Sequence, residues 1–121
     1  AKKLDIYDTL IVGDIVEKLN SFYDKFDLLI ALDVLIYIGD VESIFKAIHK
    51  CCSPNSLFVF SIEILEGSGY SLLESSRYAH SDGYIMEHTN GVFDLINFQY
   101  INLRKEGDRW IKGKIYVFKA I

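Results

Sequence analysis

The chain has 121 residues, of which half are hydrophobic, 14% are aromatic and one is proline. A chain of this length buries roughly 65% of its unfolded surface, and this composition excludes disordered and collagen-like proteins. Its 13 basic and 17 acidic residues give a net charge of −4, so no overall field attracts nucleic-acid phosphates or anionic lipid.

The longest apolar segment runs from Leu28 to Gly39, and its 12 residues include Asp33. Crossing a bilayer takes about 20 apolar residues, so we predict no membrane partner. No apolar segment of signal-peptide length follows the two N-terminal lysines. The adjacent Cys51 and Cys52 favour buried thiols in a reducing compartment over a disulfide scaffold, and we therefore expect a cytoplasmic location.

Strands and helices alternate in the first half of the sequence. A short apolar segment at 9–12 predicts a buried strand, and Asp14 is placed to cap a helix whose apolar side repeats over 15–22. The segment 26–32 is almost continuously apolar, as expected for a strand of a parallel sheet that is covered on both faces.

A clear helical repeat follows, with apolar residues at Val41, Ile44, Phe45, Ile48 and Cys51 or Cys52. Asp40 is the predicted N-cap, and Pro54 ends the helix. A third buried strand is predicted at Ser56–Ile64.

The second half of the sequence changes character. Gly67 and Gly69 open a segment that we predict to be irregular, and a short helix is expected from about Ser81 to Asn90, ended by Gly91. The strand predicted over 93–103 changes its alternation, which indicates a bulge near Tyr100. The turn KEGD then connects this strand to a last one, so the chain ends in a long antiparallel hairpin.

This order predicts an α/β fold with three parallel strands and a C-terminal antiparallel hairpin. Ligands of such sheets bind beyond the carboxyl ends of the strands, where residues 13–14, 33–40 and 63–70 would lie. The terminal hairpin argues against a flavodoxin-like or receiver fold, since those folds end in a helix.

In this order, the segments resemble the class I S-adenosylmethionine-dependent methyltransferases. YDTLIVGDIVEKL, KFDLLIALDVLIYIGDVESIF, LFVFSIE, SRYAHSDGYI and LRKEG are similar to predicted methyltransferases that sometimes carry tetratricopeptide repeats upstream. The resemblance implies a partial Rossmann-like methyltransferase sheet. It also implies that S-adenosylmethionine is the cofactor and that an unknown acceptor receives the methyl group.

The resemblance covers the C-terminal portion of the family, as a single domain over 1–121. The first two strands of the family, with their glycine-rich loop and ribose-binding acidic residue, have no counterpart here. Gly67 and Gly69 are the only glycines spaced as GxG, and no capped helix starts there, which makes them a poor substitute. Asn55 and Ser56 stand where the family has glycines, but Asn tolerates positive φ. We therefore expect the chain to be incomplete as an enzyme.

The resemblance assigns cofactor contacts to residues at the ends of two strands. Asp14 matches the acidic residue that accepts from the adenine amino group, with the N–H of Ile15 facing the ring; helix capping is the alternative for Asp14. Asp33 matches a position near the methionine moiety and the methyl acceptor, with Val34 beside it. Satisfying nearby backbone N–H groups is an equally weighted alternative for Asp33.

Three side chains of SRYAHS, namely Arg77, Tyr78 and His80, resemble the substrate-side loop of the family, and Tyr37 would line the same pocket. His80 is the candidate base, with Asp33 as the second catalytic candidate; a histidine hydrogen-bonded within a loop is the alternative for His80. The histidines and cysteines show no metal-ligand spacing, so we predict no metal site.

Two kinds of function remain open from the sequence. One is a methyltransferase that another chain completes, and the other is a non-catalytic remnant or interaction module with a methyltransferase-like fold. Without the missing strands the sheet has an open edge, so we expect either a rearranged five-stranded sheet or an oligomer or completing chain at that edge. The acidic balance disfavours nucleic acid as the methyl acceptor.

Overall fold

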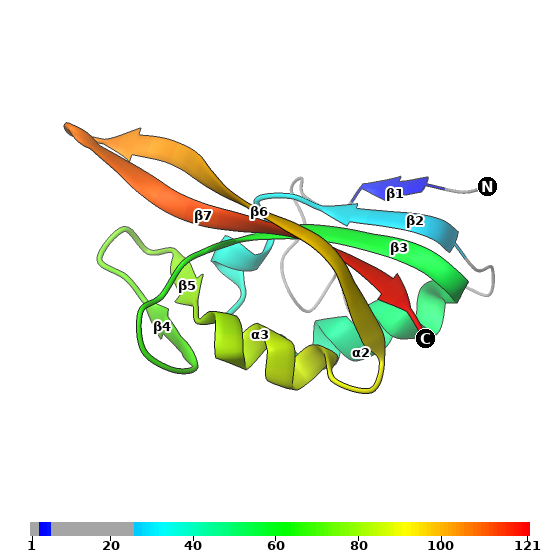
Figure 1. Ribbon diagram of the computed structural model, residues 1–121. Coiled ribbons are helices and arrows are strands. Elements are labelled where there is room, and N and C mark those ends of the chain that lie inside the picture. The colour runs from blue at the N-terminus through cyan, green and yellow to red at the C-terminus, as the bar shows by residue number, and fades with distance from the viewer. Residues whose placement is uncertain (1–2, 6–25) are drawn as a thin grey trace.

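Five strands form one mixed sheet, and two helices lie on one of its faces (Figure 1). This computed structural model describes residues 3–5 and 26–121. The strand predicted at 9–12 and the helix predicted over 15–22 lie outside the described residues, and so do the candidate residues Asp14 and Ile15.

The strand order across the sheet is β1-β2-β3-β7-β6. Parallel pairs join β1 (Lys3–Asp5) to β2 (Phe26–Ala31) and β2 to β3 (Cys52–Glu63). Antiparallel pairs join β3 to β7 (Arg109–Ala120) and β7 to β6 (Phe93–Glu106). Among the described residues the sheet therefore has five strands, and the strand beside β2 is Lys3–Asp5; the rearrangement expected for the strand at 9–12 is not tested.

Two helices lie close to their predicted positions. A single 3-10 turn, η1 (Leu35–Tyr37), leads into α2 (Glu42–Cys51), and α3 is Asp82–Thr89. The prediction that Asp40 is the N-cap of α2 is wrong by one residue, because Val41 occupies that position; Asp40 Oδ1 still accepts from the Glu42 N–H at 2.9 Å. No helix of the described residues is both long and apolar enough to cross a membrane.

The core lies between the sheet and α2. Alternate residues of β3 point toward α2, and Phe45 meets the rings of Phe58 and Phe60 at centroid distances of 5.7 and 5.2 Å. From β7, Tyr116 and Phe118 stack on Phe60 at 5.1 and 5.6 Å. These buried rings set the distance between α2 and the sheet. Because aromatic side chains bury large apolar areas, they contribute strongly to the hydrophobic stabilisation of this core.

The first part of β3 contains a residue with a positive φ, as expected from the sequence. Asn55 has a φ of +68°, and the register of β2 against β3 shifts at this point, between Phe26 and Leu28. Asn adopts this left-handed conformation more readily than most residues, because its short amide side chain bonds locally. The strand begins at Cys52, four residues before the predicted Ser56, so Pro54 lies within it.

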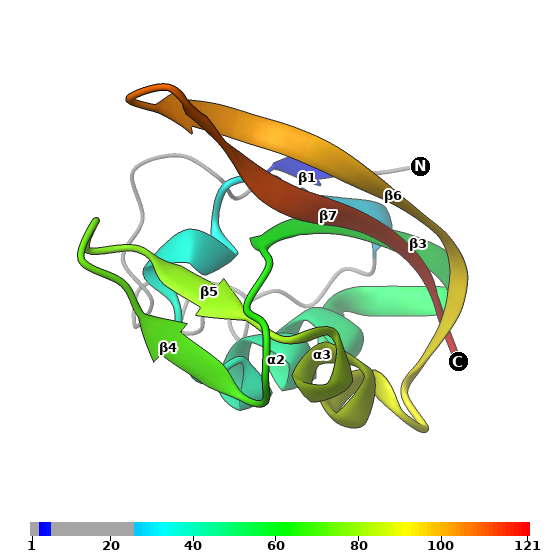
Figure 2. The same cartoon turned by 60° about the vertical axis from the view of Figure 1, so that its left-hand side comes forward.

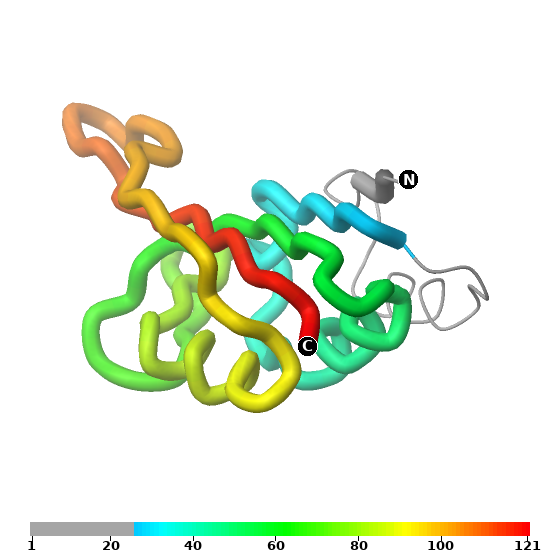
Figure 3. Tube along the Cα trace, turned by 45° about the vertical axis from the view of Figure 1, so that its right-hand side comes forward, coloured from blue at the N-terminus to red at the C-terminus, as the bar shows by residue number. Residues whose placement is uncertain are grey.

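Strands β6 and β7 form a long hairpin that extends beyond the rest of the molecule (Figures 1 and 3). Its turn is Gly107 and Asp108, as predicted from KEGD. The predicted bulge near Tyr100 is wrong in position, because Tyr100 pairs regularly with Lys114. The irregularities lie on either side, at Leu95/Asn97 and Asn102/Arg104. Each irregularity adds one residue to β6 relative to β7, so the alternation changes at two positions on either side of Tyr100.

The segment predicted to be irregular contains a second, small sheet. β4 (Tyr70–Leu72) and β5 (Tyr78–His80) pair antiparallel, and the Ser81 N–H bonds the Gly69 carbonyl at 2.9 Å. Figure 2 shows this hairpin between β3 and α3, at the end of the molecule where β3 finishes. The hairpin therefore adds a wall beside the carboxyl ends of the parallel strands.

Candidate functional site

The chain turns sharply where β2 ends. Asp33 follows the strand with a φ of +57°, and its N–H donates to Ser61 Oγ at 3.0 Å. The Asp33 residue is exposed, whereas Ser61 and Val34 are buried. The Ser61 hydroxyl thus holds the turn and leaves the Asp33 carboxylate at the carboxyl end of β2, where a ligand of this sheet would bind.

Tyr37 closes the 3-10 turn that follows, and its side chain is 59% exposed. The hairpin strand β5 packs against this turn. Asp33, Val34 and Tyr37 therefore share one short loop, and the SRYAHS segment that bears the other predicted residues lies next to it.

His80 is the most buried of the predicted site residues, with no exposed surface. Its Nε2 lies 3.0 Å from the Gly39 carbonyl oxygen, which can only accept, so Nε2 carries the proton. Among the described residues, Nδ1 has no hydrogen-bond partner. Burial lowers the pKa of His80 below its ordinary value of 6.5, although backbone hydrogen bonds to Gly39 and Ile38 act in the opposite direction. The imidazole is neutral at pH 7.

Aromatic rings surround the Gly39 backbone. A Cβ at Gly39 would overlap the Tyr70 ring and lie 2.8 Å from Tyr78 Cε1. Tyr84 of α3 stacks on His80 at 6.1 Å and accepts from the Val41 N–H at 3.1 Å. Only glycine leaves room for these rings, so position 39 couples the β4–β5 hairpin to the start of α2.

Ion pairs link Arg77 to the long hairpin. Arg77 Nη1 lies 3.6 Å from Glu106 Oε2, and Arg104 bonds both Glu106, at 3.2 Å, and Glu63 Oε1, at 2.5 Å. Burial alone would lower the pKa of Arg104, but hydrogen bonds to Glu63 and Glu106 outweigh it and raise that pKa. Glu63 is buried at the end of β3 and lines a cavity of about 370 Å³ together with Glu74 and other residues.

A second charged cluster lies at the start of α3. Lys114 Nζ is 2.7 Å from Asp82 Oδ1, and its ammonium lies 4.3, 5.2 and 4.8 Å from the ring centres of Phe98, Tyr100 and Tyr116. The hydrogen bonds from Lys114 and from the Tyr116 hydroxyl lower the pKa of Asp82. Cation–π contacts and one carboxylate thus compensate the burial of the Lys114 charge.

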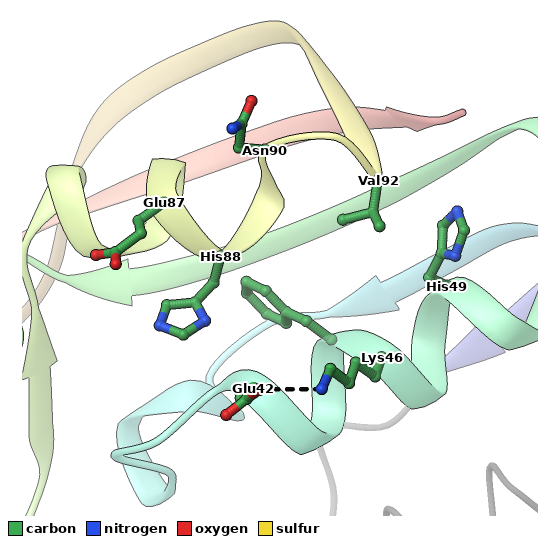
Figure 4. A pocket seen from close by; sticks show the side chains of 8 residues that line it. Glu42, Lys46, His49, Glu87, His88, Asn90 and Val92 are labelled. Atoms are coloured by element: carbon green, nitrogen blue, oxygen red, sulfur yellow. Dashed lines mark hydrogen bonds and ion pairs between the residues drawn. The ribbon is translucent and has the colours of Figure 1, made fainter.

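A shallow groove of about 300 Å³ separates α2 from α3 (Figure 4). His88 points from α3 toward α2, and the Glu42–Lys46 ion pair lies along the facing side of α2. Charges of both signs and two histidines line this groove over Phe45 and Val92. None of the predicted site residues lies in it.

Sequence patterns placed Glu63 at the edge where ligands bind, but they did not predict the contacts of Ser61, Glu63 and Arg104. Ser61, Glu63 and Arg104 lie in strands that appear ordinary in the sequence, and each contacts its partner across 28 or 41 positions. The one available signal was Glu63, a carboxylate at the end of an apolar strand. Gly39 was noted only as the end of an apolar segment, because its role depends on two distant tyrosines.

No protein-family model matches the sequence, and no curated protein matches it. Solved structures do match. The N-methyltransferase NodS from Bradyrhizobium japonicum WM9, in complex with S-adenosyl-L-homocysteine, superposes with a TM-score of 0.63 at 16% identity, over 88% of this chain and 51% of that one.

Two further structures agree. A SAM-dependent methyltransferase from Methanosarcina mazei gives a TM-score of 0.62 at 14% identity, over 84% of this chain and 63% of that one. Magnesium protoporphyrin IX methyltransferase from Synechocystis PCC 6803, with bound SAM, gives 0.59 at 15% identity, over 84% and 42%. This chain thus spans about half the length of these enzymes. At such identities the likeness establishes the fold alone: the chain shares the α/β fold of S-adenosylmethionine-dependent methyltransferases.

Proposed function

We propose that the chain is the C-terminal portion of a class I S-adenosylmethionine-dependent methyltransferase, of the kind that sometimes carries tetratricopeptide repeats. One observation supports this most: parallel strands β2 and β3 continue into the antiparallel pair β7 and β6, and this arrangement superposes on NodS over 88% of the chain. The methyl acceptor is not specified by the site. A cytoplasmic location belongs to the same proposal.

The described residues fit one side of such a cofactor site. The exposed Asp33 carboxylate, at the carboxyl end of β2 with Val34 behind it, suits an ammonium group such as that of a methionine moiety. The described residues provide no glycine-rich loop between a strand and a helix. Gly67 and Gly69 have positive φ, but the segment continues into β4 rather than into a helix. When bound, S-adenosylmethionine would supply an activated methyl group, and the protein would supply mainly alignment.

The geometry supports a proposal for the substrate side of the site. Tyr37 is exposed beside Asp33, whereas Tyr78 packs near Gly39 and Arg77 pairs with Glu106. His80 as a general base stays a prediction; its buried ring donates to the Gly39 carbonyl, and this contact positions the loop that carries Tyr37. We propose Asp33 and Tyr37 as the residues that face cofactor and acceptor, with Arg77 and Tyr78 forming the wall behind them.

The remaining half of the cofactor site would come from a completing segment or chain. Among the described residues, the short β1 pairs only with Leu28, Leu29 and Ile30 of β2, so this side of the sheet is where we place its attachment. A non-catalytic module with the same fold is the competing proposal, and cofactor binding separates the two.

Nuclear magnetic resonance titration of the ¹⁵N-labelled chain with S-adenosylhomocysteine tests the proposal on the half-site itself. We expect shifts at the amides of residues 33–37, with weak, millimolar binding, because half of the contacts are missing. Asp33→Ala is expected to abolish these shifts, and Asp94→Ala, on the far strand β6, to leave them unchanged. An unperturbed 33–37 loop at saturating ligand would favour the non-catalytic module.

A further inference from the structure

Strand β6 forms a long edge of the sheet that lacks the usual protection. In the described part of the chain its 14 residues pair with β7 alone. The nine residues from 95 to 103 contain no charged residue and no proline. Edge strands of soluble proteins normally carry charged residues or proline, because an edge without them offers its backbone N–H and C=O groups to another strand.

Large apolar side chains gather on the same hairpin. Phe98 is 47% exposed and Tyr100 is 63% exposed, and Leu95, Ile96 and Trp110 are also exposed. Phe98 pairs with Tyr116 and Tyr100 with Lys114, so both rings lie on one face of the hairpin, beside the Lys114 ammonium. Rings held in place by a buried cation lose little conformational entropy on binding a partner.

We propose that β6 pairs antiparallel with β6 of a second copy, about a two-fold axis at Gln99, to form a continuous sheet through both molecules. In this register Phe98 lies opposite Tyr100 of the second copy, and the two-fold repeats that contact. Aromatic pairs at directly opposed positions are among the stabilising cross-strand pairs of antiparallel sheets. This proposal is independent of the methyltransferase function.

A pair of opposite charges supports this register. Each half of β6 contains one extra residue relative to β7, at Ile96 before Gln99 and at Leu103 after it. In this register Ile96 lies opposite Asn102 and Leu103 lies opposite Leu95 of the second copy, so the extra residues lie one position apart across the pair. Asp94 then lies opposite Arg104 of the second copy. A register centred on Tyr100 would instead place Asp94 opposite Glu106, a repulsive pair.

Sedimentation velocity of the 121-residue chain measures its association. We expect a dimer for the wild type, and a roughly 100-fold weaker dimer for Phe98→Glu/Tyr100→Glu, because glutamates then oppose each other across the axis. Lys114 lies beside both positions, so we expect the double variant to stay folded, which far-UV circular dichroism checks. Leu72→Glu, at a position that is 58% exposed on β4, is the matched control and keeps the dimer.

A charge swap tests the register itself. In Phe98→Glu/Tyr100→Lys each glutamate faces a lysine of the second copy, and dimerisation is expected to return. If Tyr100 lay on the axis, lysine would face lysine and the dimer would stay weak. A monomeric wild type or an open-ended polymer would overturn the proposal. Equal association of the wild type, Phe98→Glu/Tyr100→Glu and Phe98→Glu/Tyr100→Lys would overturn it as well.

Discussion

At the scale of single residues, His80 shows how burial sets a titration. The folded protein holds the imidazole neutral, with a pKa below 6.5, whereas the unfolded chain titrates near 6.5. Between those two values the unfolded state binds more protons, so the free energy of unfolding decreases as the pH falls below about 6.5. His80→Gln keeps a donor for the Gly39 carbonyl but cannot titrate, and we expect it to lose this part of the pH dependence.

Urea unfolding at a series of pH values measures the effect. His88→Gln is the matched control, since His88 lies on the α3 side of the groove and does not bond Gly39, and it should keep the wild-type slope. Equal slopes for the wild type and His80→Gln would contradict this explanation.

Single residues of the site were predictable where a local pattern determines them. Asp33 follows an apolar strand, and the end of that strand alone places it at the sheet rim. The Ser61 hydroxyl that holds its N–H and the pairing of Glu63 with Arg104 were not predictable, because these contacts join strands whose register no local pattern encodes. The burial of His80 depends in the same way on Tyr84 of α3 and on the distant Gly39.

At the scale of elements, periodicity predicted the helices and the buried strands. α2 shows a regular apolar repeat, and α3 has Ser81 as its N-cap, accepting from the Tyr84 N–H at 3.2 Å. The β4–β5 hairpin was missed because β4 is exposed along its length, so no alternation of apolar and polar residues marks it. Its position is determined instead by the contact of its tyrosines with Gly39.

That contact predicts a large effect from one methyl group. Gly39→Ala would force the Tyr70 and Tyr78 rings away, and we expect it to lower the free energy of unfolding by about 1–3 kcal/mol, as overpacking does. Trypsin cleavage after Arg77 should accelerate as the hairpin loosens. Gly83→Ala, where an added Cβ meets no atom within 4 Å, is the control and should be neutral or stabilising. Equal effects of the two substitutions would refute the role of Gly39.

At the scale of the whole molecule, the sequence predicted a parallel sheet that ends in an antiparallel hairpin, and the strand pairing agrees for β2, β3, β7 and β6. The strand that it placed at 9–12 lies outside the described residues, and the described strand that pairs with β2 on this side is Lys3–Asp5. This strand is one leucine between a lysine and an aspartate, which gives no periodic signal, and its pairing with β2 depends on the assembled sheet.

The same topology has a kinetic consequence. β6 and β7 are neighbours in sequence, joined by a two-residue turn in which Gly107 has a φ of +63°, whereas β3 pairs with β7 across about half of the chain. Local hairpins form within microseconds, and distant strand pairs form much later. We therefore expect the hairpin to be formed in the folding transition state.

Gly107→Ala should then slow refolding and leave the unfolding rate nearly unchanged in stopped-flow experiments. Gly91→Ala strains a similar positive φ, +82°, in the loop before β6 and should mainly accelerate unfolding. If Gly107→Ala and Gly91→Ala changed the refolding rate and the unfolding rate in the same proportion, an early hairpin would be excluded. If the order is as expected, the hairpin is the template on which β3 docks, and the strand at the centre of the finished sheet joins it late.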